Sequence, residues 1–178
     1  MIDRKLKVKI CMVGDSAVGK TSLIKKFVLD IFDDSYITTI GTKITKRTMG
    51  ILDDKTTMDM MIWDIMGQSS FRSLLQDAYF YGTHGVIAVV DSTRPETLEN
   101  IHEWVHSVKQ VVGDVPMVFI ANKCDLDRAV TKDMLEKELG QYGCRFLYGS
   151  AKTGENVSEA FRILGESIID KYFPEMKS

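Results

Sequence analysis

The chain has 178 residues, which is enough for one domain with a full hydrophobic core. Its 23 lysine and arginine residues against 25 aspartate and glutamate residues give a net charge of -2, which offers no electrostatic case for binding nucleic acid. The three cysteines are odd in number and scattered, which favours free thiols over a disulfide framework.

No segment of the sequence indicates insertion into a membrane. The longest purely apolar stretch, residues 86–90, is far too short to cross a bilayer. The N-terminus has no signal-peptide hydrophobic region, Ile2 excludes myristoylation at that position, and residues 174–178 contain no cysteine for prenylation. We therefore expect a cytoplasmic protein whose membrane association no lipidation motif supports. Either the native protein lacks an anchor or a lipidated tail has been removed.

Strand-like and helical segments alternate along the chain. Residues 6–13 read as a buried strand, and residues 44–49 and 57–64 as a hairpin. Residues 85–91, 117–121 and 146–149 read as further parallel strands. Apolar residues at helical spacing lie between and after them, namely Leu98, Ile101, Val105, Val108 and Val112, then Val157, Ala160, Phe161, Leu164 and Ile168. This order predicts one α/β domain over residues 1–178, with a six-stranded, mostly parallel sheet and helices on both faces.

The segment after the first strand matches the phosphate-loop pattern G-x-x-x-x-G-K-[ST]. Its residues from the first glycine onward are Gly14, Asp15, Ser16, Ala17, Val18, Gly19, Lys20 and Thr21, followed by Ser22. Glycines let the backbone wrap closely around phosphate, and the N–H groups at the helix start attract anions. Lys20 can reach the β- and γ-phosphates, and the Thr21 hydroxyl can ligate Mg2+. A chance glycine turn is the alternative, which the strand–loop–helix setting makes a minor one.

Two later loops favour guanine over adenine. Asn122, Lys123, Cys124 and Asp125 directly follow the strand at 117–121. The Asp125 carboxylate can accept two N–H groups of guanine, whereas adenine offers a lone pair there, a mismatch that costs about 1–3 kcal/mol or more. A second base loop, formed by Ser150, Ala151 and Lys152, follows the next strand.

In combination these motifs resemble the Ras superfamily of small GTPases, over residues 6–172, and imply the P-loop NTPase (small G-protein) fold. The resemblance implies that Asn122 ties the base loop to the phosphate loop and that the Lys123 stem packs on guanine. It also implies that the Ala151 N–H meets the guanine oxygen and that Phe32 packs against the base. For Phe32, a place in the hydrophobic core is the alternative.

Residues 36–41 and 79–85 are similar to segments of the Rab branch. Tyr36 in the first segment is expected to contact the nucleotide, and Thr39 matches the switch I threonine that ligates Mg2+ when GTP is bound. The stretch after Gly41 departs from the usual Rab pattern.

The pattern D-x-x-G begins at Asp64, at the end of the third predicted strand. By the same resemblance, Asp64 holds Mg2+ through water, the Gly67 N–H contacts the γ-phosphate and Gln68 orients the attacking water. Gln68 and Lys20 are thus the catalytic candidates. The family normally has Thr-Ala between the aspartate and the glycine, whereas this chain has Ile65 and Met66. This departure indicates slower intrinsic hydrolysis, a partner surface, or simply a locally filled gap.

The predicted function is a molecular switch that binds GTP and GDP with Mg2+ and hydrolyses GTP. Its expected partners are an exchange factor, an activating protein and effectors that read the two switch loops, and we expect a monomer. Apolar residues are expected to form the reading surface, namely Ile40, Ile65, Met66, Phe71 and Leu74. Packing in the hydrophobic core is their alternative role, above all for Phe71 and Leu74. A role in membrane trafficking follows only by analogy to Rab proteins. The alternatives are a GTP-binding interaction module with little hydrolysis and, disfavoured by the base loops, a P-loop kinase or ATPase.

Overall fold

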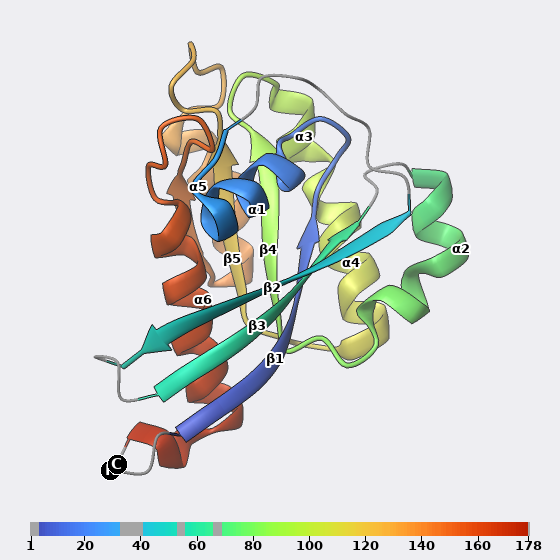
Figure 1. The fold of residues 1–178 in the computed structure, drawn as a ribbon. Coiled ribbons are helices and arrows are strands. Elements are labelled where there is room, and N and C mark those ends of the chain that lie inside the picture. Colours follow the sequence, from blue (N-terminus) through green and yellow to red (C-terminus); the bar gives the residue numbers. More distant parts are fainter. Residues whose placement is uncertain (1–3, 33–40, 53–55, 66–68, 178) are drawn as a thin grey trace.

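The computed structural model describes residues 4–32, 41–52, 56–65 and 69–177, and for residues 69–74 it describes the backbone alone. Within these residues, six strands form one sheet in the spatial order β2-β3-β1-β4-β5-β6 (Figure 1). The strands are β1 (Arg4–Val13), β2 (Thr42–Ile51), β3 (Thr56–Ile65), β4 (Gly85–Asp91), β5 (Met117–Asn122) and β6 (Arg145–Tyr148). Only β2 is antiparallel to its neighbour, so the predicted mostly parallel sheet is confirmed.

Helices cover both faces of this sheet. They are α1 (Lys20–Leu29), α2 (Ser69–Phe80), α3 (Pro95–Glu99), α4 (Ile101–Val112), α5 (Lys132–Leu139) and α6 (Val157–Tyr172), with short 3-10 turns η1 (Gly140–Tyr142) and η2 (Pro174–Lys177). One hydrophobic cluster joins the sheet to α1 and α6, and a second joins its other face to α2, α3, α4 and α5. Among the described residues, no helix combines the length and the apolar character that crossing a bilayer requires.

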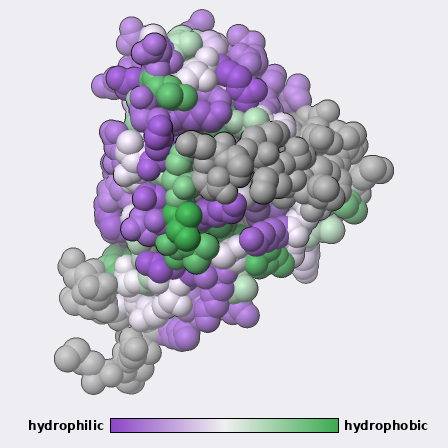
Figure 2. Space-filling model, turned by 45° about the horizontal axis from the view of Figure 1, so that its top comes forward, coloured by the Kyte–Doolittle hydropathy of each residue, from purple (hydrophilic) through white to green (hydrophobic). Residues whose placement is uncertain are grey.

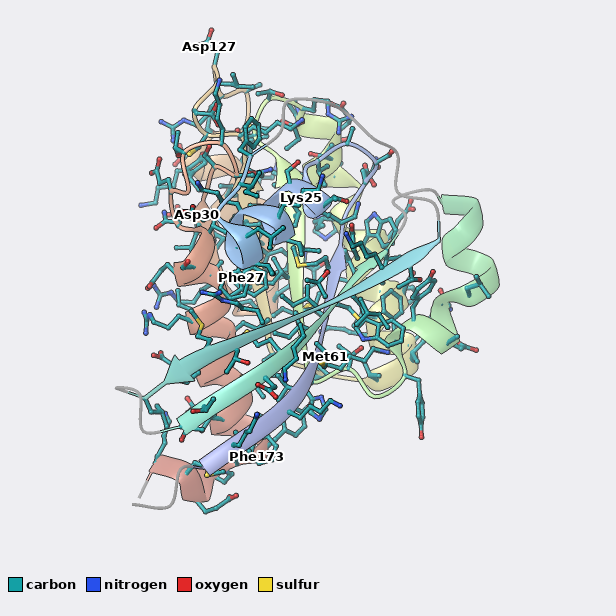
Figure 3. The ribbon with its side chains drawn as sticks, in the orientation of Figure 1. Lys25, Phe27, Asp30, Met61, Asp127 and Phe173 are labelled. Atoms are coloured by element: carbon teal, nitrogen blue, oxygen red, sulfur yellow. The ribbon has the colours of Figure 1, made fainter. Side chains whose placement is uncertain are left out.

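The central strand β1 supplies side chains to both clusters, because successive residues of a strand point to opposite faces. Ile10 and Met12 belong to the α1 and α6 side, whereas Cys11 belongs to the other side. On the first side, Phe27 of α1 stacks on Phe161 of α6 with ring centroids 3.9 Å apart; Figure 3 shows Phe27 within this layer. This packing fixes α1, and with it the loop that precedes α1.

The predicted hairpin is present and is longer than the apolar pattern indicated. β2 and β3 pair from Thr42 opposite Ile65 to Ile51 opposite Thr56, so the ladder extends beyond residues 44–49 and 57–64 at both ends. Polar and β-branched residues continue the strands because main-chain hydrogen bonds, and not burial alone, hold an edge ladder together.

The segment predicted to present one helical face, residues 98–112, contains two helices. α3 ends at Glu99 and α4 begins at Ile101, with Asn100 between them. Trp104 is fully buried and anchors α4, whereas Val112, which was expected on the buried face, is only partly buried. The last strand begins at Arg145, one residue before the predicted start.

Candidate functional site

Four loops follow the carboxyl ends of β1, β4, β5 and β6. β1 has β3 on one edge and β4 on the other, so the strand order reverses at β1, which is where open α/β sheets bind ligands. Figure 2 turns this end of the molecule toward the viewer, and the coloured surface there is mostly hydrophilic with a short hydrophobic strip. In Figure 3, Asp127 marks the outer tip of the loop after β5. The sequence motifs fall on these loops.

The loop after β1 needs glycine at both ends. Gly14 has φ 140°, and a Cβ built there would lie 2.2 Å from the carbonyl oxygen of Val89 in β4. Gly19 has φ 101°, and its Cβ would lie 2.2 Å from the amide nitrogen Nδ2 of Asn122. Ala17 also has a positive φ of 63°. The backbone therefore curls tightly before it enters α1, whose first turn has no side-chain cap.

Lys20 lies within the curl of this loop. Its side chain is buried, and Nζ donates to the carbonyl oxygens of Gly14 at 2.7 Å and Asp15 at 2.8 Å. Burial lowers the pKa of Lys20 to about 8, although the nearby Asp64 and Asp15 carboxylates act in the opposite direction. A phosphate beside this amine would favour its charged form.

Thr21 and Asp64, both predicted to hold Mg2+, are brought together. The Thr21 hydroxyl donates a short hydrogen bond to Asp64 Oδ2, and the Asp64 side chain is buried. No cluster of three or more histidine, cysteine, aspartate or glutamate residues occurs in the described part of the chain. Two hard oxygen donors fit Mg2+, which commonly takes one or two protein ligands and completes its shell with phosphate and water.

Asn122 connects the phosphate loop to both base loops. Its Nδ2 donates to Val18 O at 2.9 Å, and its Oδ1 accepts the Ala151 N–H at 3.1 Å. The side chain is only 1% exposed, so neither partner group has water as a substitute. One buried amide therefore fixes the distance between two loops that contact different ends of any ligand lying across them.

Ser150 orients Asp125 at the outer end of the site. The Ser150 hydroxyl donates to Asp125 Oδ1 at 2.6 Å and accepts the Thr153 N–H at 3.1 Å. Asp125 itself is exposed, so its carboxylate remains accessible to a ligand. Such a carboxylate can accept two adjacent N–H donors from a ring edge.

Asp91 is a site residue that the sequence analysis missed. Its carboxylate is 1% exposed and accepts Lys123 Nζ at 2.5 Å and the Thr93 hydroxyl at 2.6 Å. Burial alone would raise the pKa of Asp91, but the hydrogen bonds from Lys123 and Thr93 outweigh it and hold the pKa below its ordinary value. Lys123 also donates to Ala17 O at 2.8 Å. The sequence does contain a signal for Asp91, because it is an acidic residue at the end of an otherwise apolar strand.

Asp15 of the phosphate loop is held from α4 and its start. Its two oxygens accept Trp104 Nε1 at 2.9 Å and Asn100 Nδ2 at 2.7 Å. Both carboxylate oxygens therefore anchor the loop. This anchoring is an alternative to the predicted contact of the Asp15 side chain with nucleotide.

The other residues predicted for the site or for a partner surface lie in different segments of the structure or outside its described residues. Ser22 is half-buried in α1, and Lys152 is exposed. Phe32 is partly buried and packs against the α1 and α6 cluster, and its contact with a base stays a prediction. Ile65 is 2% exposed and packs in the other cluster, so its expected place on a reading surface is wrong. Four predicted site residues lie outside the described residues, namely Tyr36, Thr39, Gly67 and Gln68.

The fold and these loops define a P-loop nucleotide-binding protein with a guanine-type base loop. The sequence model of the Ras family matches residues 9–170. Ras-related protein Rab-13 of Bos taurus is 39% identical over 166 residues, covering 92% of this chain and 80% of the relative. Human Ras-related protein Rab-8B is 37% identical, covering 92% and 79%, and Rab-8 of Diplobatis ommata is 37% identical, covering 94% and 80%. The chain belongs to the Ras family and is a GTP-hydrolysing small GTPase of its Rab branch.

Proposed function

We propose that this small GTPase is a molecular switch that binds GTP and GDP with Mg2+ through the residues assembled at the strand ends. Asn122 carries this proposal, because its single side chain bonds the phosphate loop and the second base loop at once. A ligand that occupies both loops must have phosphate at one end and a ring with N–H donors at the other, as a guanine nucleotide has.

At the phosphate end, the loop N–H groups and the α1 N-terminus receive the anionic oxygens, and Lys20 neutralises charge on the β- and γ-phosphates. Thr21, Thr39 and, through water, Asp64 would hold Mg2+, which would supply positive charge against the negative charge of the phosphates. Gln68 orients the attacking water, and the Gly67 N–H contacts the γ-phosphate. Because the chain mainly positions the reactants, the rate depends on how accurately Gln68 is placed.

At the base end, Asp125 accepts the two guanine N–H groups, and Lys123 packs its stem on the ring. Ser150 bonds one oxygen of the Asp125 carboxylate and so restricts its orientation. The Ala151 N–H, which bonds Asn122 Oδ1 in this structure, would be shared with the guanine oxygen. Adenine would leave the carboxylate facing a lone pair, which supplies the discrimination.

Loss of the γ-phosphate would release Thr39 and Gly67 and with them the two switch loops, an order change that partners can read. An exchange factor, an activating protein and effectors are the partner classes that such a cycle requires. The Rab relatives motivate a role in membrane trafficking.

The test is single-turnover phosphate release from purified protein loaded with GTP and Mg2+, beside a Gln68→Leu variant. Slow release that falls further in the variant supports a hydrolytic switch. Equal rates in both proteins would refute the role of Gln68 in the isolated chain. The preference of the site for GDP over ADP, measured by competition in the wild type and in Asp125→Ala, tests guanine recognition independently of hydrolysis.

A second candidate function is a GTP-binding interaction module that scarcely hydrolyses. Met66, next to the predicted γ-phosphate contact, motivates it, since a bulky flexible side chain there can displace Gln68. Met66→Ala should then raise the single-turnover rate. An unchanged rate would remove this reason for expecting slow hydrolysis.

A further inference from the structure

Three consecutive carbonyl groups of the phosphate loop are each bonded by a different side chain. Ser16 O accepts Arg94 Nη2 at 2.9 Å, Ala17 O accepts Lys123 Nζ at 2.8 Å, and Val18 O accepts Asn122 Nδ2 at 2.9 Å. Asn122 and Lys123 belong to the base motif. Arg94 belongs to no motif, and it comes from the loop between β4 and α3.

These bonds determine where the loop N–H groups point. In a planar trans peptide, the carbonyl of one residue and the N–H of the next point in opposite directions. The bond from Arg94 to Ser16 O therefore directs the Ala17 N–H away from Arg94, and the bonds from Lys123 and Asn122 act in the same way on the next two peptides. The N–H groups of Ala17, Val18 and Gly19 are therefore oriented by side chains that bond the loop from the side opposite to these N–H groups.

Arg94 is itself held in place by Asp91. Its Nε lies 3.2 Å from Asp91 Oδ2, the same oxygen that accepts Lys123 Nζ. Asp91 Oδ1 is occupied by the main-chain N–H and the hydroxyl of Thr93. A buried carboxylate thus keeps two cations at a fixed spacing, and these cations bond adjacent carbonyls of the phosphate loop.

The backbone of Arg94 is equally fixed. Its N–H donates to Asp91 O at 3.0 Å, and its carbonyl accepts the Thr97 hydroxyl at 2.7 Å at the start of α3. Pro95 at the first position of α3 restricts the backbone further. The guanidinium therefore reaches the loop from a rigid base, and its two bonds use the forked donor geometry that lysine lacks.

We propose that Arg94 is a positioning residue that aims the Ala17 N–H at the phosphates of the bound nucleotide and so slows nucleotide release. Arg94 acts through the Ser16–Ala17 peptide and does not touch the nucleotide. This role rests on the proposed binding of guanine nucleotide to the phosphate loop. It gives Arg94, which lies outside the family motifs, a part in holding that loop.

Release of a fluorescent GDP analogue, chased with excess GDP in Mg2+, tests this role in the full chain. Arg94→Ala should release the analogue about three- to tenfold faster, as expected for one charge-assisted hydrogen bond that is partly exposed to water. Arg94→Lys keeps the charge beside Asp91 but loses the second donor, so its release rate should fall between the two. Arg162→Ala is the matched control, since Arg162 is similarly exposed but pairs with Glu159 and Glu166 on α6, and it should release at the wild-type rate.

Thermal unfolding at saturating GDP checks that the variants are folded. Equal release from Arg94→Ala and the wild type would overturn the proposal, as would equal acceleration in Arg94→Ala and Arg162→Ala. If Arg94→Ala does not fold, Arg94→Lys decides, and an unchanged rate there would likewise refute the role. Failure of the wild type to bind the analogue at all would instead overturn the proposed nucleotide function.

Discussion

Gly19→Ala is the substitution for which the structure gives the sharpest expectation. The new Cβ would lie 2.2 Å from Asn122 Nδ2, where ordinary contact needs about 3.4 Å or more. Asn122 would have to move by about 1 Å, which is enough to break its hydrogen bonds to Val18 O and Ala151 N. The positive φ of 101° adds backbone strain that any L-residue other than glycine must bear.

The magnitude follows from these parts. Two buried polar groups left without partners cost about 1–3 kcal/mol each, and the left-handed backbone costs about 1–2 kcal/mol more. The sum is about 3–8 kcal/mol. The nucleotide-free loop can relax away part of this cost, whereas a loop closed around phosphate cannot. If only the lowest value, about 3 kcal/mol, destabilises the nucleotide-bound state relative to the free state, GDP binding weakens by about 100-fold.

Equilibrium titration with a fluorescent GDP analogue measures this loss, and Gly140→Ala provides the matched control. Gly140 has φ −56° and a Cβ there would meet no atom within 4 Å, so alanine should leave GDP affinity unchanged and stability equal or slightly higher. GDP affinity of Gly19→Ala within threefold of the wild type would refute the reasoning, since the contact would then be relieved without disturbing Asn122.

Three further outcomes are expected elsewhere in the molecule. Ser150→Ala removes the donor to Asp125 and should weaken GDP binding roughly tenfold, whereas Ser167→Ala, whose hydroxyl bonds only within α6, should not; equal affinities would contradict this. Hydrogen bonds from lysine and threonine neighbours hold the pKa of Asp59 well below its usual range, so its stabilisation is present above the unfolded pKa of about 4 and lost as pH falls further. Urea unfolding of Asp59→Asn should therefore show lower stability at pH 7 and a shallower acid decline, and parallel pH curves would argue against it. Burial raises the pKa of the Cys11 thiol to about 11, so a thiol reagent at pH 8 should modify Cys11 only after unfolding, and rapid loss of that thiol in the folded protein would disprove the point.

The features that the sequence predicted correctly are those that depend on a pattern within one short segment. The phosphate loop was recognisable because glycine spacing and the strand–helix setting lie within one short segment. Arg94 and Ser16 are 78 positions apart, and no local pattern could predict their hydrogen bond. Ile65 was misjudged because a motif position suggested exposure, while the strand alternation that buries it depends on the register with β2. The break at Asn100 escaped detection because apolar spacing continues across it.

The pairing of Thr42 with Ile65 has a consequence for the two segments proposed as switch loops. The chain enters β2 from residues 33–41 and leaves β3 into residues 66–68, so both segments join the sheet at one cross-strand pair, within about 5 Å. Thr42 and Ile65, where the two segments meet the described strands, are thus held together by one pairing. A change in the turn at the far end of the hairpin would leave this pairing intact. A one-residue slip of β3 along the ladder would instead turn Ile65 out of its cluster and change which residue lies opposite Thr42.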